Sequence, residues 1–332
     1  MPNLRVLTTR RVGIAMLVTA SVVTSIVTRV ATAQSYPAKP VRVIVAYPPG
    51  QGTDIATRHM SEQLGRALGQ NFIVENRPGA GGNVGTEATA RSAPDGYTLT
   101  MGTTATHAAN QFMYASVGYD PEKDFEPIAL IGSLPMVISV HPSFAATNIQ
   151  QLIAAAKAKP DTINVALTST TARVVFELLR LQGGAPLFGV PYRGSAPAMT
   201  DVLGGQVPLT IDTVTATRPQ VNAGRLRALA ITTLKTSELL PGVPSVAEQG
   251  LPGFEITAWN ALFAPRGTPP AVINQLNAEV VKALAQPETR QRLIQIGFEP
   301  AGPLTPQQLG DFVRAERRKW GDIIRTAQIK AE

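Results

Sequence analysis

Residues 41–60 read VRVIVAYPPGQGTDIATRHM, and this order of residue types predicts a strand, a loop and a helix. The apolar, mostly β-branched run Val41–Val45 is typical of a buried strand. The next stretch, residues 47–52, contains two prolines and two glycines and cannot continue either regular structure. Thr53 and Asp54 are both favoured N-cap residues, so we expect them to open a helix.

The predicted helix has apolar residues at helical spacing and a glycine at its end. The apolar residues are Ala56, Met60, Leu64 and Leu68, and Gly69 is a typical C-cap. A strand followed by a glycine loop and a helix N-terminus often binds an anion, because the free amides and the helix dipole point outward there. The opening stretch therefore predicts an anion site.

The first 33 residues predict a secretory signal peptide. Three arginines precede the uncharged apolar run Val12–Val27, and Ala31-Thr32-Ala33 fits the A-x-A cleavage pattern. We expect cleavage near Ala33 and a soluble periplasmic protein. The alternative is an uncleaved membrane anchor, for which the apolar run is short. The export route, general secretory or twin-arginine, stays open.

Composition and motifs narrow the classes of function. The absence of cysteine excludes disulfides, thiolate metal sites and cysteine nucleophiles. The net charge of +7 includes four arginines of the predicted signal peptide and falls to +3 without them, so it does not indicate nucleic-acid binding. The sequence contains no G-x-S-x-G, P-loop or H-E-x-x-H motif. These absences leave few catalytic options, and we expect no metal site.

Strand candidates alternate with helical segments along the chain, which predicts an α/β fold with mainly parallel sheets. After the first, the strand candidates are residues 71–75, 97–101, 127–140, 163–167, 187–190, 207–211, 226–232 and 255–264. Caps at Thr268 and Thr305 mark two C-terminal helices, the second with a capping box.

Two of the strand candidates, near residues 128–140 and 255–264, are too long for one ordinary strand. They suggest two crossovers between the lobes of a hinged binding protein. We expect residues 34–135 and 256–332 to form one lobe and residues 136–255 to form the other.

Two further strand ends carry clusters of hydroxyl groups. Residues 97–101 lead into Gly102-Thr103-Thr104-Ala105-Thr106-His107, and residues 163–167 lead into Thr168-Ser169-Thr170-Thr171. Ligands of parallel sheets bind at such strand ends. Ordinary helix capping is the alternative for each cluster, but three clusters together favour a shared anion cleft.

Two further features of the sequence bear on functions other than anion binding. The glycines of residues 79–85 are spaced G-x-G-x-x-x-G, one residue too long for a dinucleotide fingerprint, so we expect a tight turn that leads into a helix. A catalytic triad of Asp54, Asp212 and His107 stays open, although no local motif supports it.

Several short motifs occur in the order typical of one known family. They are Pro48–Asp54 (PPGQGTD), Asn76–Gly82 (NRPGAGG), Pro94–Tyr97 (PDGY), Tyr119–Pro121 (YDP), Val190–Ala198 (VPYRGSAPA), Leu203–Gln206 (LGGQ) and Ala264–Pro270 (APRGTPP). From about Tyr36 to the C-terminus, the chain resembles the Bug proteins, the TctC-like extracytoplasmic solute receptors of tripartite tricarboxylate transporters. The resemblance implies a two-lobed, type II-like periplasmic binding protein that closes like a Venus flytrap.

The resemblance also implies a function without catalysis. Such a receptor binds a dicarboxylate, a tricarboxylate, an acidic amino acid or an aromatic acid, and delivers it to a two-component integral membrane permease. We expect a monomer that needs no cofactor. The alternatives from other classes are an exported hydrolase acting on a small organic acid and a periplasmic sensor or interaction module.

The family's carboxylate-binding loops match three loops and one aspartate of this chain. The positions implied to bind ligand are Tyr47, Pro49, Gly50, Gln51, Gly52, Thr53, Asp54, Thr103, Thr104, Thr106, His107, Thr168, Ser169, Thr170, Thr171, Arg173 and Asp212. The sequence departs from the family at Gln51, where glycine is preferred, and in the shortened loop 167–173, where Arg173 is near the usual histidine. Both changes favour a ligand with two acidic ends, or with one acid and a polar far end. The alternative places Arg173 on the outer face of its helix.

Overall fold

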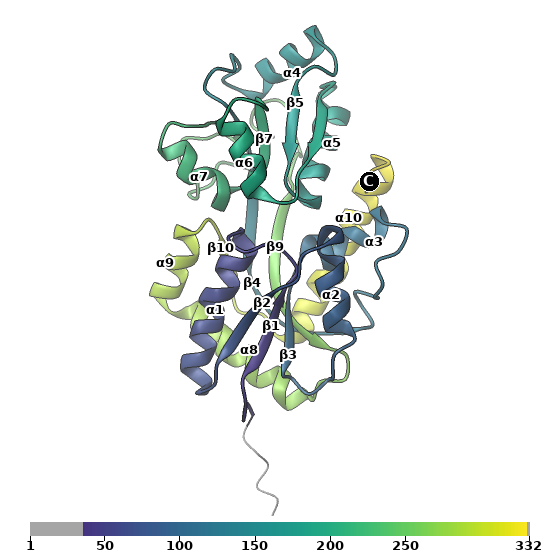
Figure 1. Ribbon diagram of the computed structural model, residues 1–332, viewed down its shortest axis with the longest axis vertical. Coiled ribbons are helices and arrows are strands. Elements are labelled where there is room, and N and C mark those ends of the chain that lie inside the picture. Colours follow the sequence, from purple (N-terminus) through teal and green to yellow (C-terminus); the bar gives the residue numbers. More distant parts are fainter. Residues whose placement is uncertain (1–35, 331–332) are drawn as a thin grey trace, which may run out of the picture. The chain divides into compact units, whose positions relative to one another are not determined.

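The computed structural model of the protein describes residues 36–330 (Figure 1). The predicted signal peptide, residues 1–33, lies outside the described residues. Within the described part of the chain, no helix combines the length and the apolar character needed to cross a bilayer.

The opening stretch folds as a strand and a helix, with one correction at the helix start. Strand β1 is Val41–Val45 and helix α1 is Gly52–Leu68, with Gly69 as a left-handed C-cap. The N-cap of α1 is Gln51, so Thr53 and Asp54 already lie inside the helix. The expectation that they open the helix was therefore wrong. The Asp54 carboxylate accepts the N–H of Gly50, the residue before the N-cap, at 2.9 Å.

All the strand candidates are strands. Their bounds are β2 Phe72–Asn76, β3 Thr98–Thr103, β4 Phe125–Val140, β5 Asn164–Leu167, β6 Phe188–Pro191, β7 Leu209–Thr213, β8 Arg227–Ile231 and β9 Thr257–Pro265, with a short β10 at Glu299–Pro300. The further α-helices are α2 Asn83–Ala90, α3 Asn110–Met113, α4 Ile149–Ala158, α5 Thr170–Gly183, α6 Ser195–Leu203, α7 Val214–Asn222, α8 Pro270–Ala285, α9 Pro287–Gln295 and α10 Pro306–Thr326. The capping box at Thr305 is present at the start of α10.

The glycine-rich segment before α2 forms the expected tight turn. Residues Ala80–Gly82 make one 3₁₀ turn, and Gly82 has a φ of 99°, which disfavours any residue with a Cβ. A Cβ on Gly82 would also lie 2.8 Å from the side chain of Thr106. The segment is a tight turn in which the backbone comes close to the Thr106 side chain.

The strands form one sheet in the order β2-β1-β3-β9-β4-β7-β5-β6, with β8 and β10 paired to β4. The pairs β1–β2, β1–β3, β5–β6 and β5–β7 are parallel. The antiparallel pairs all include β4 or β9. The α/β architecture is as expected. The sheet is mixed because β9 runs against β1, β2 and β3, whereas β4 runs against β5, β6 and β7.

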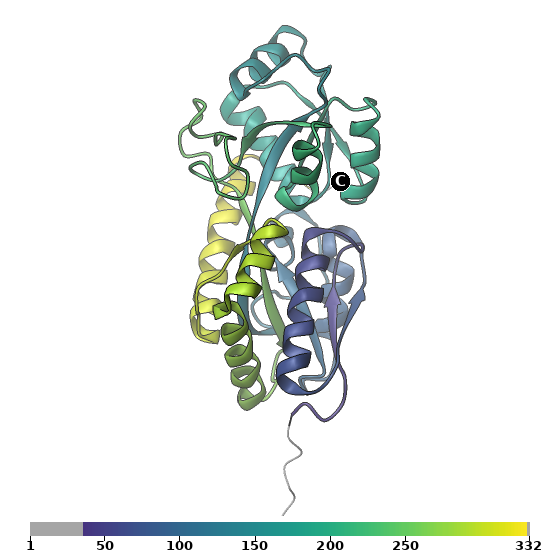
Figure 2. The same cartoon turned by 90° about the vertical axis from the view of Figure 1, so that its left-hand side faces the viewer.

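These two strands, β4 and β9, connect two lobes (Figures 1 and 2). Residues 125–135 of β4 pair with β9, whereas residues 136–140 pair with β7 and β8. We call the part with β1, β2, β3 and β10 the first lobe, and the part with β5, β6, β7 and β8 the second lobe. Because β4 belongs to both lobes, its backbone connects them directly.

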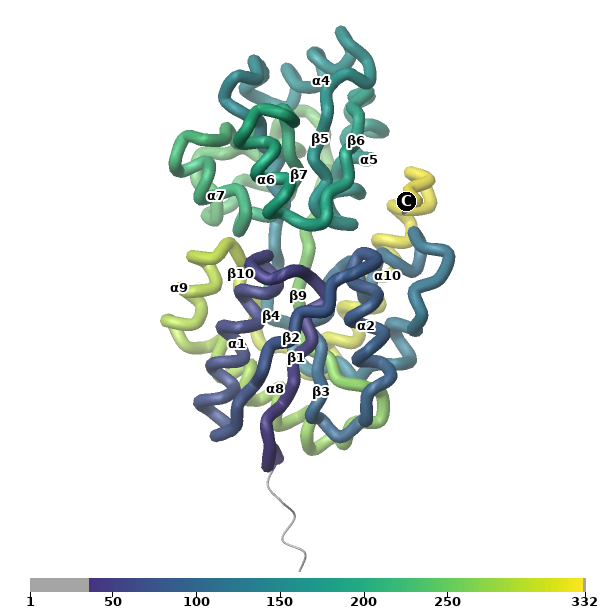
Figure 3. The backbone as a smooth tube through the Cα atoms, viewed as in Figure 1, coloured from purple at the N-terminus to yellow at the C-terminus, as the bar shows by residue number. Residues whose placement is uncertain are grey.

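The apolar core continues from one lobe into the other. A single buried cluster includes Leu179 and Leu209 of the second lobe, Trp259 of β9, and Phe263 and Trp320 of the first lobe. In the first lobe, α1 packs beside α8, and the C-terminal helix α10 packs beside α3 (Figure 3).

Thr232 joins the two connecting segments between the lobes. Its hydroxyl accepts the Met136 N–H at 3.0 Å and donates to the Ile256 carbonyl at 2.6 Å. Its own N–H and carbonyl bond Met136 and Ile256 as well, and the side chain is fully buried. One residue therefore links β4 to the segment that enters β9.

We expect Thr232→Val to lower the free energy of unfolding by about 1–3 kcal/mol, because it leaves a buried N–H and a buried carbonyl without their partner. Urea denaturation followed by circular dichroism measures this loss. Thr232→Ser keeps the hydroxyl and should lose less.

The matched control is Thr89→Val, because the buried Thr89 hydroxyl bonds only the Gly85 carbonyl of its own helix. Equal losses at positions 89 and 232 would contradict a special role for Thr232.

Candidate ligand-binding cleft

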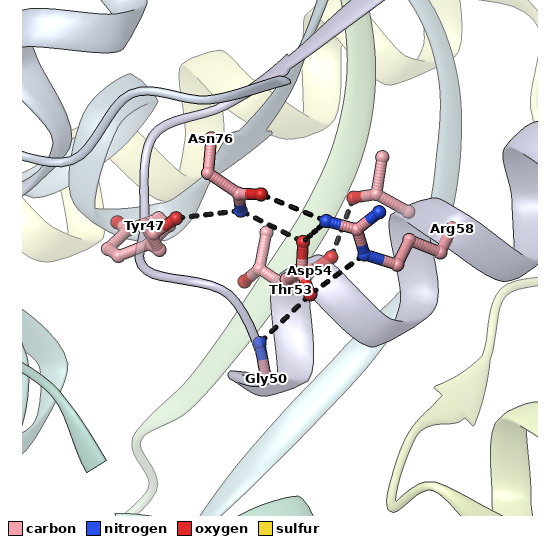
Figure 4. Close-up of polar contacts among 7 residues, drawn as sticks. Tyr47, Gly50, Thr53, Asp54, Arg58 and Asn76 are labelled. Carbon is pink, nitrogen blue, oxygen red and sulfur yellow. Dashed lines mark hydrogen bonds and ion pairs between the residues drawn. The ribbon is translucent and has the colours of Figure 1, made fainter. Parts of the chain in front are cut away.

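The first loop is held in place by Asp54 (Figure 4). The Asp54 carboxylate accepts the Gly50 N–H at 2.9 Å and the Asn76 side-chain amide at 2.8 Å, and it forms an ion pair with Arg58 at 2.9 Å. Asn76 also donates to the Tyr47 carbonyl at 3.0 Å. Burial opposes ionisation, but the bonds from Arg58, Gly50 and Asn76 outweigh it and lower the pKa of Asp54. Asp54 is thus an ionised residue that positions the loop.

A small cavity of about 50 Å³, which we call the inner cavity, lies between the loops of the two lobes. Both lobes and both connecting strands line it. Its lining residues are Tyr47, Gln51, Gly52, Thr53, Thr103, Ala105, Leu134, Met136, Thr168, Ser169, Thr171, Ser195, Asp212, Thr213, Ala258 and Asn260.

Four helices begin at the inner cavity. Gly52 is the first residue of α1, Ser169 is the N-cap of α5, Ser195 is the first residue of α6, and Thr213 is the N-cap of α7. The first amides of a helix have no partner within the helix, and the dipole makes this end positive. Among the described residues, no lysine, arginine or histidine lines the cavity. The attraction for an anion therefore comes from helix N-termini and neutral donors.

A second and larger cavity of about 710 Å³, which we call the outer cavity, adjoins the inner one. The two share Tyr47, Gln51, Thr168 and Ser169. The remaining lining residues are Ala46, Pro48, Pro78, Gly79, Ala80, Gly81, Gly82, Met113, Tyr114, Leu167, Thr170, Arg173, Pro191, Tyr192, Arg193, Gly194 and Lys330. Three of them are basic, so positive side chains stand around the outer cavity and not around the inner one.

Most of the sequence-predicted site residues line these cavities. Those that do are Tyr47, Gln51, Gly52, Thr53, Thr103, Thr168, Ser169, Thr170, Thr171, Arg173 and Asp212. Those that line neither cavity are Pro49, Gly50, Asp54, Thr104, Thr106 and His107. Three loops far apart in sequence therefore meet at one cleft.

Thr104 and His107 occupy the interior behind the cleft. The Thr104 hydroxyl accepts the Trp259 N–H at 2.8 Å and so ties the loop after β3 to β9. The His107 ring stacks on Phe263 with 4.0 Å between ring centroids and is fully buried. Burial, with a smaller effect of Arg317, lowers the pKa of His107 to about 3. His107 is a neutral core aromatic.

The alternative of a catalytic triad is not supported by these positions. His107 Nδ1 lies 2.9 Å from the Thr106 hydroxyl, Asp54 bonds within the first loop, and Asp212 bonds Ser195 and Thr213 in the second lobe. Within residues 36–330, no three histidine, aspartate or glutamate side chains gather as metal ligands would.

The two residues that depart from the family pattern both reach the cleft. Arg173 lines the outer cavity and bonds Glu177 Oε1 through its Nε at 3.0 Å. Gln51 of the first lobe touches the turn at Gly194 of the second lobe, where a Cβ would lie 2.4 Å from Gln51 Nε2. Gly194 has a φ of 102°, so this close contact requires glycine for two reasons.

The lobes contact each other on both sides of the cleft. The Thr170 hydroxyl of α5 donates to Asn110 Oδ1 of α3 at 3.1 Å. Arg218 of α7 donates to the carbonyl of Ile294 at 3.1 Å, at the end of α9. The cleft is therefore bounded by polar contacts between the lobes.

Asn260 and Ser195 are cavity residues that the sequence did not reveal. Asn260 is in the middle of β9, where no loop or motif marks it. Ser195 belongs to a recognised motif, VPYRGSAPA, which gave no role to its hydroxyl; here that hydroxyl donates to Asp212 Oδ1 at 3.0 Å. Thr213 donates its N–H to the same oxygen at 2.7 Å.

Asp212 is 1% exposed, and burial raises its pKa to about 6 in spite of the bonds from Thr213 and Ser195. An unfolded aspartate has a pKa of about 3.9, so between these values the folded protein holds more protons than the unfolded chain. We expect the ligand-free protein to lose up to about 3 kcal/mol of stability from this residue as the pH rises from 4 to 6, and no more above pH 6.

Urea denaturation of Asp212→Asn and the original protein from pH 4 to pH 8 measures this effect as the difference between them. The variant should gain relative stability across pH 4–6 and keep a constant advantage above it. Asp311→Asn, which removes an exposed acid of α10, is the matched control. A pH-independent difference for Asp212→Asn would contradict the raised pKa.

The chain is similar to known proteins over most of its length. Residues 56–329 match the family model described as the tripartite tricarboxylate transporter family receptor. Protein BugT of Bordetella pertussis is 37% identical over 302 residues, which cover 90% of this chain and 92% of that protein.

Two solved structures of receptors from Rhodopseudomonas palustris resemble the fold. Rpa4515 with adipate has a TM-score of 0.86 at 36% identity, covering 89% of this chain and 99% of that one. MatC (Rpa3494) with bound malate has a TM-score of 0.82 at 32% identity, covering 87% of this chain and 100% of that one. The family consists of solute receptors and not of enzymes. This chain belongs to the tripartite tricarboxylate transporter receptor family, the TctC-like Bug proteins.

Proposed function

We propose that this protein is a periplasmic receptor that binds a small carboxylate in the cleft between its lobes and delivers it to a two-component membrane permease. The observation that carries the proposal is the inner cavity, where four helices begin and no cationic side chain is present among the described residues.

This set of donors suits a carboxylate. Backbone amides at helix N-termini, the hydroxyl of Thr171 and the amide of Asn260 can all donate to its oxygens. Hydrogen bonds to an ionised acceptor are about twice as strong as neutral ones. Because these donors are fixed before the ligand arrives, binding needs little ordering of the protein.

The outer cavity would receive the rest of the ligand. Its apolar lining includes Pro48, Met113 and Tyr114, and its basic residues favour a polar or acidic far end. Receptors of the family with adipate and with malate are known, and both compounds are dicarboxylates. We therefore place a ligand with two acidic ends first, ahead of a simple monocarboxylate.

We also propose that the two lobes move relative to each other and that the protein is exported. The lobes would be residues 34–135 with 256–332 and residues 136–255, and they would close about the segments near Leu134–Val137 and Ile256–Asn260. Membership of the receptor family supports export after cleavage near Ala33, and delivery to the permease by a monomer.

A thermal-shift screen of organic acids tests the proposed function. A dicarboxylate at a hundredfold excess over its Kd should stabilise the purified protein by about 2.7 kcal/mol. Each acid that stabilises should be recovered unchanged after incubation, as judged by mass spectrometry. Conversion of the acid would favour the hydrolase alternative, and a screen without any stabilising acid would favour the sensor or interaction module.

Asn260→Ala tests the donor that faces the bound carboxylate. We expect it to weaken binding of every acid that binds by roughly tenfold to a hundredfold, because a hydrogen bond to a charged group is lost. Isothermal titration calorimetry measures the change. Asn222→Ala, at an exposed position in α7, is the matched control and should bind normally. Normal binding by Asn260→Ala would remove Asn260 from the site.

A further inference from the structure

Two buried polar atoms of the inner cavity have no hydrogen-bond partner within the described part of the chain. They are Asp212 Oδ2, an acceptor, and Asn260 Nδ2, a donor. Each residue is only 1% exposed, and both line the same small cavity. Buried polar groups nearly always have a partner, so a donor and an acceptor left unpaired in one cavity indicate a ligand that supplies both.

The surroundings of Asp212 fix which of its oxygens faces the ligand. Oδ1 already accepts the Ser195 hydroxyl at 3.0 Å and the Thr213 N–H at 2.7 Å. These two bonds hold the carboxyl group and leave Oδ2 for the cavity. The orientation of Asp212 is thus set before any ligand binds.

Asn260 has one longer contact on the oxygen side of its amide. Its Oδ1 faces the Thr53 hydroxyl, which lies 3.5 Å away at the start of α1. The opposite side of the amide group therefore carries the unpaired Nδ2 donor. A ligand carboxylate is the acceptor that the helix N-termini around the cavity also favour.

A carboxylate without a neighbouring donor does not match this pair. An ionised Asp212 can only accept hydrogen bonds, and no cationic side chain among the cavity-lining residues offsets its charge. A ligand carboxylate placed beside it meets a like charge at low dielectric. The mismatch disappears when the ligand itself brings a hydroxyl or an ammonium group to Oδ2.

We propose that the cleft selects acids that carry a hydrogen-bond donor, a hydroxyl or an ammonium group, on the carbon next to the bound carboxylate. Asn260 donates to the carboxylate, and Asp212 accepts from the neighbouring group. The donor must be close to the carboxylate because both protein atoms line a cavity of about 50 Å³, whereas the larger outer cavity takes the rest of the molecule. This inference rests on the proposed function and specifies its ligand.

The experiment compares matched acids of two lengths by isothermal titration calorimetry at pH 7.5. Succinate, malate and aspartate form one series, and adipate, 2-hydroxyadipate and 2-aminoadipate form the other, with both enantiomers of each chiral acid. In the series that binds, we expect a substituted acid to bind on the order of tenfold to a hundredfold more tightly than the unsubstituted one. The hydroxy and amino members distinguish the two kinds of donor.

Asp212→Asn shows whether Asp212 is the residue that selects the substituted acid over the unsubstituted one. The amide keeps an oxygen for Ser195 and Thr213 but turns a donor toward the cavity, so the preference for the substituted acid should fall to about threefold or less. Asp311→Asn, which removes the same charge from an exposed site on α10, should keep the full preference. The readout is the ratio of the affinities for the substituted and the unsubstituted acid. A general loss of affinity for both acids would leave this ratio unchanged.

The outcomes separate this inference from the proposed function. If acids bind but the unsubstituted member binds as tightly as its partners, the pair in the cavity is satisfied by water and the inference is wrong. If the preference for the substituted acid persists in Asp212→Asn, the inference is also wrong, because another group then recognises the substituent. If no acid of either series or of the wider screen binds, the proposed function itself is wrong. The comparison of substituted with unsubstituted acids in the original protein tests the inference even if a variant fails to fold.

Discussion

The pairing of β4 with β9 is the constraint on which the rest of the structure depends. β4 gives residues 125–135 to a ladder with β9 and residues 136–140 to ladders with β7 and β8, so one strand belongs to both lobes. β4 runs in the same direction as the parallel strands of the first lobe and against those of the second lobe, so the parallel strands of both lobes end on the cleft side. The loops after β1, β3, β5 and β7 meet there because strand direction leaves them no other place. Thr232 then ties the β4 and β9 segments together at the point where the lobes are joined.

The electrostatics of the cleft follow from this convergence. A single helix N-terminus is a weak anion site, but the beginnings of α1, α5, α6 and α7 lie around one cavity and attract an anion without any cationic side chain among its described lining residues. Such a site avoids burying an arginine or lysine, which would be costly whenever the ligand is absent. The basic residues Arg173, Arg193 and Lys330 stand around the outer cavity, where solvent can reach them. The two cavities thus differ in the kind of group they can hold.

Several polar residues near the cleft hold it in shape and line neither cavity. Asp54 fixes the first loop through Gly50, Arg58 and Asn76, and Thr104 attaches the second loop to Trp259. His107 fills the core against Phe263. In a site built from loops, much of the polar sequence is used to satisfy and orient backbone groups, because a loose loop would lose the fixed positions that binding requires.

The sequence by itself determined the strands and helices, the α/β class, the family and the three loops that form the cleft. These features depend on local signals: apolar periodicity, glycine and proline breaks, and helix caps such as Thr305. Only the tertiary structure decided which polar atoms are left for a ligand. The sequence gives Thr53 and Thr104 the same prediction, a position in a carboxylate-binding loop. In the structure, Thr53 lines the inner cavity, whereas Thr104 bonds a strand more than 150 residues away. Asn260 carries no local signal at all, because a residue in the middle of a strand becomes part of a site only when distant chain segments close around it.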